Sequence, residues 1–126
     1  MSLKLLLTIS GGLETLAGLA ALISPVVVIS MLLGSPADPS ALVVARLFGA
    51  AAFALGLACL KAREDVGAPA AVAVSIGITA YNVLAAVVLI WAAAGLNLGG
   101  VLLWAAGIGH AVLGVLFLSA LVGTRR

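Results

Sequence analysis

Charged side chains are scarce in this sequence of 126 residues: only 8% are Asp, Glu, Lys or Arg, whereas 65% are hydrophobic. A soluble globular domain of average composition carries about 25% charged residues. Six basic and four acidic side chains are too few to cover a core of this size with a polar shell. We therefore expect lipid to surround the protein, and we predict an all-α integral membrane fold.

The sequence also has little of what metal and redox sites require. It contains one cysteine, Cys59, and one histidine, His110. A single chain of this kind has no disulfide and cannot supply the ligands of a tetrahedral zinc site. The membrane spans described below contain no second carboxylate for a di-metal site. The sequence therefore predicts neither a metal site nor a cofactor.

Motifs for catalysis and nucleic-acid binding are missing as well. We find no glycine-rich phosphate loop and no evident Ser-His-Asp set. The six Lys and Arg residues are scattered and form no basic patch, so we expect no nucleic-acid partner. These absences favour a protein without enzymatic activity, although they do not decide the question.

Four apolar stretches are long enough to span a membrane, which takes about 20 residues for about 30 Å of hydrocarbon. They cover residues 3–23, 41–60, 70–94 and 101–122. The connections are short, so we predict one four-helix bundle over 1–126 in which consecutive helices are antiparallel neighbours. Pro25 predicts a break after the first stretch, because proline lacks a backbone donor. Residues 26–33 should then form a kinked or interfacial extension.

The charged residues between the stretches predict an orientation. Lys or Arg side chains lie at one set of helix ends, whereas the opposite ends carry only Asp38 outside the spans. The positive-inside rule then places the N-terminus, the second loop and the C-terminus in the cytoplasm. Trp91 and Trp104 flank the third loop, as interfacial aromatics do at the outer surface. The basic residues in this count are Lys4, Lys61, Arg63, Arg125 and Arg126.

Small residues recur at helical spacing within the spans. Glycine occurs 15 times, for example at Gly49, Gly56 and Gly107. Such residues let membrane helices approach closely. They either pack the bundle only, or line a substrate path or a dimer seam, and the sequence does not separate these alternatives.

Each span contains one strongly polar residue, namely Glu14, Arg46, Asn82 (next to Tyr81) and His110 in chain order. A charged side chain at the centre of a bilayer costs at least about 2.5–3.5 kcal/mol, so such residues face the bundle interior and often mark function. With a rise of about 1.5 Å per residue, all four lie in a band that extends from the midplane of the bilayer into its outer half. We therefore predict one polar pocket that opens outward, in which Glu14 and Arg46 form an ion pair.

The run from Arg46 to Leu57, RLFGAAAFALGL, together with the Glu in the first span and the His in the fourth, resembles the small DoxX-like bacterial membrane proteins. The resemblance implies a small helical bundle in the bacterial inner membrane. Some members of that group are described as quinone-linked oxidoreductase subunits, and many have no assigned activity.

Three hypotheses follow for the polar residues. The first is a binding protein, alone or as an accessory subunit, whose pocket holds the head group of a membrane lipid or quinone-like molecule. The second is a small oligomeric transporter that uses Glu14, with or without His110, as a proton-coupled site. The third is a purely structural Glu14–Arg46 clasp. A homo-oligomer or a larger membrane complex is compatible with each. The predicted ligand-binding residues are Glu14, Arg46, Tyr81, Asn82 and His110.

Overall fold

The computed structural model describes residues 1–123, and within them the chain forms five helices joined by short loops. Four of these helices are long and apolar enough to cross a membrane, which confirms the predicted number of spans. The chain is therefore a small all-α, multi-pass membrane protein. Arg125 and Arg126, which enter the predicted orientation, lie outside the described residues. The helices are α1 (Leu3–Ile23), α2 (Pro25–Leu33), α3 (Pro39–Ala62), α4 (Pro69–Gly95) and α5 (Leu103–Gly123).

Proline marks the start of three helices. Pro25, Pro39 and Pro69 lie in the first turns of α2, α3 and α4. An amide at this position has no partner within the helix, so the missing N–H of proline costs nothing there. Asp38 caps α3, because its Oδ1 accepts a hydrogen bond from the Ala41 amide at 2.9 Å. Because the first turns include Pro39 and Pro69, α3 and α4 begin slightly before the predicted spans.

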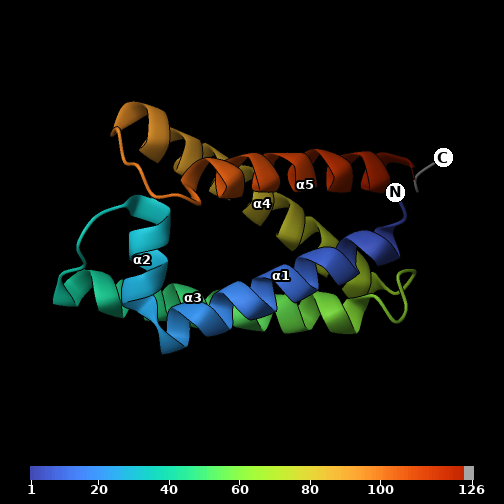
Figure 1. Cartoon of the computed structure of the whole chain (residues 1–126). Helices are drawn as coiled ribbons and strands as arrows, with labels where there is room; N and C mark the ends of the chain where they lie inside the picture. The colour runs from blue at the N-terminus through green and yellow to red at the C-terminus, as the bar shows by residue number, and fades with distance from the viewer. Residues whose placement is uncertain (124–126) are drawn as a thin grey trace.

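The helix α2 is separate from α1. Ser24 leaves the helical conformation, with φ −130° and ψ 60°, and Pro25 follows it. Figure 1 shows α2 turning away from α1 and crossing towards α5, at the end of the molecule remote from the N-terminus. The Leu102 amide donates a hydrogen bond to the Met31 carbonyl at 2.9 Å. This bond joins α2 to the segment that leads into α5.

The long helices form two closely packed pairs. One pair is α1 with α3 and the other is α4 with α5, while contact between the pairs is much less extensive. Figure 1 shows the pairs as two layers. Consecutive spans are thus close neighbours within each pair, as predicted, but α3 and α4 touch only in part.

Glycines bring α1 and α3 together. Gly11 and Gly18 on α1 face Gly56 and Gly49 on α3. A Cβ atom at Gly49 would lie 2.8 Å from the Gly18 carbonyl oxygen, which is closer than real Cβ contacts. The two backbones therefore pack directly on each other, as small residues permit in membrane helices.

Buried apolar side chains join the two pairs at one end and attach α2 to the α4–α5 pair at the other. One cluster lies towards the N-terminus and draws on all four long helices. It contains Leu6, Leu7, Cys59, Ile78 and Phe117. At the other end, Ala92, Ala93 and Leu103 pack with Leu33 of α2. The pairs separate between these two clusters, and a cavity lies there.

The outer surface is apolar. Leu16, Val44, Val87 and Val115, one from each long helix, are between 61% and 68% exposed. A soluble protein rarely exposes apolar side chains over so much of its surface. This exterior is suited to contact with lipid tails.

Candidate functional site

A cavity of about 850 Å³ lies between the two helix pairs. Its walls come mainly from alanine, valine and leucine side chains of α1, α2, α4 and α5, and Phe48 adds a contribution from α3. The polar side chains among the lining residues are Glu14, Ser24, Tyr81 and His110. The site is therefore an apolar chamber with a few polar groups on its wall.

The helix α2 lies across one end of this cavity. Val27, Val28 and Met31 of α2 line the cavity at the end remote from the N-terminus. This is the end at which the pocket was predicted to open, and α2 lies across it. Leu13, Leu84 and Val27 line the cavity and are each more than half exposed, so the cavity reaches the surface of the molecule next to several helices.

Glu14 lies in the middle of α1 on its buried face. The residue is only 4% exposed and lines the cavity. The Tyr81 side chain of α4 interacts with its carboxyl group. The carboxyl group is thus held between α1 and α4.

Asn82 orients the single histidine of the chain. Asn82 is fully buried, and its Nδ2 donates a hydrogen bond to the Ile78 carbonyl at 2.8 Å. Its Oδ1 therefore accepts a hydrogen bond from Nδ1 of His110, also at 2.8 Å. This assignment puts a hydrogen on Nδ1, so Nε2 of the neutral ring carries a lone pair.

Tyr81 connects the carboxyl group to the imidazole. The Tyr81 and His110 rings meet edge to face, with centroids 5.4 Å apart and planes at 86°. The polar side chains thus form one continuous series, Glu14–Tyr81–His110–Asn82, across three helices. The structure brings together four of the five predicted ligand-binding residues.

Arg46 is the predicted residue that lies apart. It is exposed, does not line the cavity, and forms no ion pair with Glu14; within residues 1–123 the ion pair is Lys61–Glu64. Gly18 faces Gly49 in the antiparallel pair, so Glu14 is level with Phe53. Arg46 is seven residues from that level, or about 10 Å along the axis. The register of the glycine contacts therefore separates the two charges.

Two features of the site were not predicted from the sequence. One is the contribution of α2, whose uniformly apolar sequence was interpreted as an extension of the first span. The other lies next to the site: Ser10, one turn before Glu14, does not line the cavity but is fully buried, and its hydroxyl has no hydrogen-bond partner among the described residues. The spacing of Ser10 and Glu14 on one helix face was the signal that pointed to it.

The polar side chains at the site can form hydrogen bonds and exchange protons. In residues 1–123, no three His, Cys, Asp or Glu side chains are grouped closely enough to hold a metal ion. A carboxyl, a phenol and an imidazole do lie beside an apolar space. Groups of this kind orient the polar part of a ligand whose remainder is apolar.

Comparison with protein families, curated proteins and solved structures finds no match to this chain. The resemblance to DoxX-like proteins therefore stays a prediction, and the cavity is the observation from which a function is argued.

Proposed function

We propose that this membrane protein binds a lipid-like molecule in the cavity between its helix pairs. The head group would lie at Glu14, Tyr81 and His110, and the apolar part would lie against the alanine, valine and leucine walls. Asn82 acts in this proposal as a positioning residue, because it holds the His110 ring without lining the cavity.

The cavity is the observation that supports this proposal. Small-molecule sites have volumes of about 300–1,000 Å³, mostly apolar walls and a small number of polar groups. A cavity of about 850 Å³ with four polar side chains, three of them from three different helices, has this character. Exposed apolar side chains among its lining residues offer entry from the surrounding lipid. A membrane lipid and a quinone-like molecule both have the required form.

The other hypotheses have less support. The structural clasp requires a Glu14–Arg46 ion pair, which the glycine register prevents. The proton-coupled transporter is favoured by one observation, the connected series from Glu14 to His110. However, α2 lies across one end of the cavity, so transport requires this helix to move. Roles as an accessory subunit or a homo-oligomer are proposals compatible with ligand binding.

A cavity-filling variant tests ligand binding. Gly109 lines the cavity and Gly77 does not, and a Cβ atom at either would meet nothing within 4 Å. We expect native mass spectrometry to detect a retained lipid-like molecule on wild type and Gly77→Leu, and to detect it on far fewer molecules of Gly109→Leu. Equal retention by both variants, or no retained molecule on any of them, contradicts the proposal.

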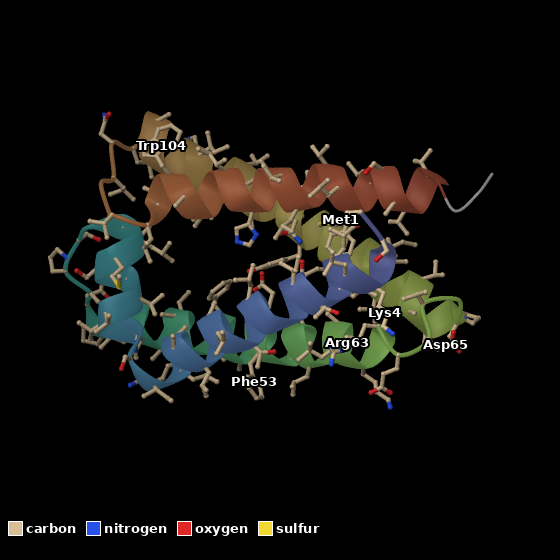
Figure 2. The ribbon with its side chains drawn as sticks, turned by 45° about the vertical axis from the view of Figure 1, so that its right-hand side comes forward. Met1, Lys4, Phe53, Arg63, Asp65 and Trp104 are labelled. Atoms are coloured by element: carbon tan, nitrogen blue, oxygen red, sulfur yellow. The ribbon has the colours of Figure 1, made fainter. Side chains whose placement is uncertain are left out.

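We also propose that the termini and the α3–α4 loop face the cytoplasm of a bacterial inner membrane. Figure 2 shows Lys4, Arg63 and Asp65 at one end of the molecule and Trp104 at the other. This arrangement supports the proposal, because basic residues favour the cytoplasmic side and tryptophan favours a membrane interface.

Two loop glycines at opposite ends test this orientation. Gly67 and Gly99 are both exposed, and a side chain at either meets no close contact. With Cys59 replaced by Ala, an impermeant maleimide added to intact cells should label Gly99→Cys and leave Gly67→Cys unlabelled until the membrane is opened. The reverse pattern contradicts the orientation.

A further inference from the structure

The cavity contains an acidic group without a basic one. Glu14 lines it at mid-length of α1, and none of its lining residues, all of which are described, is Lys or Arg. Arg46, the basic residue of the neighbouring span, is exposed. Along the helix axis it lies about two helical turns from the level of Glu14. The charge distribution of the cavity is therefore one-sided.

We infer that the cavity prefers a lipophilic cation to a lipophilic anion of the same length. This inference rests on the proposed binding function and names the class of head group. An isolated carboxyl group in apolar surroundings keeps its proton unless a cation accompanies the charged form. A bound cation supplies the partner that the ionised form lacks, whereas a bound anion finds no basic side chain in the cavity to pair with.

The neighbours of Glu14 favour the same head group. The neutral His110 ring uses its Nδ1–H for Asn82, which leaves a lone pair on Nε2. The Tyr81 hydroxyl is already engaged with Glu14. The rings of Tyr81 and Phe48, which both line the cavity, offer faces to which a cation is attracted. The cavity thus presents hydrogen-bond acceptors and aromatic rings to a ligand. Of its two hydroxyl groups, that of Tyr81 already interacts with Glu14, which leaves that of Ser24 as a donor.

Two probes with the same alkyl chain test the inference. Decyltrimethylammonium and decanesulfonate are each titrated against the protein in nanodiscs. Binding at the cavity is defined as the binding that is lost in Gly109→Leu and retained in Gly77→Leu. We expect the ammonium probe to bind the wild-type cavity at least about tenfold more tightly, because only the ammonium group can form an ion pair with the ionised Glu14. Glu14→Gln should abolish this preference, and the exposed control Glu64→Gln should preserve it.

The outcomes separate this inference from the proposed function. If decanesulfonate binds as tightly as the ammonium probe, and Gly109→Leu removes both, then the cavity binds ligands but the inference is wrong. If Gly109→Leu removes neither, both proposals fail. If Glu14→Gln does not fold, the comparison of the two probes on wild type still decides the charge preference.

Discussion

The glycine contact between α1 and α3 makes a sharp prediction about stability. A Cβ atom at Gly18 would lie 2.6 Å from the Gly49 carbonyl oxygen and 2.8 Å from the Phe53 Cα. These are backbone atoms, so they cannot rotate away as a side chain can. To reach the 3.4 Å of an ordinary contact from 2.6 Å, the helices must separate by at least about 0.8 Å, and the Phe53 backbone nitrogen, which lies closer still, requires more. We expect Gly18→Ala to lower the free energy of unfolding by about 1–3 kcal/mol, as overpacking does.

Gly12 provides the matched control on the same helix. A Cβ atom there would meet nothing within 4 Å. Gly12→Ala should therefore be neutral or stabilising by up to about 1 kcal/mol, because alanine is the better helix former. Reversible unfolding in detergent, monitored by circular dichroism, measures both variants. If Gly18→Ala is as stable as Gly12→Ala, the close packing of α1 on α3 is incorrect.

The remaining predictions concern one buried and one exposed group. Asn82→Ala removes the hydrogen bonds to Ile78 and His110, so it should lower the free energy of unfolding by about 1–3 kcal/mol. The exposed control Ser119→Ala should change the free energy of unfolding little. Equal effects of the two substitutions would contradict the hydrogen bonds of Asn82. In the α3–α4 loop, the Lys61 ammonium lowers the pKa of the Glu64 carboxyl through a hydrogen bond. The Glu64 carbon-13 signal should therefore titrate below pH 4.5, and Lys61→Met should raise its midpoint; an unchanged midpoint refutes the pair.

The helices could be predicted because their signal is local. Long apolar runs and prolines mark α1, α3, α4 and α5 to within two residues. The grouping of Glu14, Tyr81, Asn82 and His110 could also be anticipated, because polar side chains at membrane depth turn towards one another. The separation of Arg46 from Glu14 could not, because it depends on which glycines of α1 and α3 face each other. Depth along two separate helices does not determine that register.

The position of α2 shows a second limit. Its sequence, PVVVISMLL, is as apolar as a span and carries no signal of direction. The turn at Ser24 and the bond from the Leu102 amide to the Met31 carbonyl set its course across the cavity. The second of these is a contact between segments far apart in the chain, so the position of α2 at the cavity cannot be predicted from either segment alone.

The single histidine permits a direct test of ligand binding at the polar side chains. Nitrogen-15 labelling of histidine gives signals from His110 alone, because the sequence contains one His. When the delipidated protein is returned to a lipid extract of its own membrane, the Nε2 signal should shift while Nδ1, held by Asn82, stays nearly constant. An Nε2 signal that does not move, or a ring protonated on Nε2 and not on Nδ1, contradicts the account.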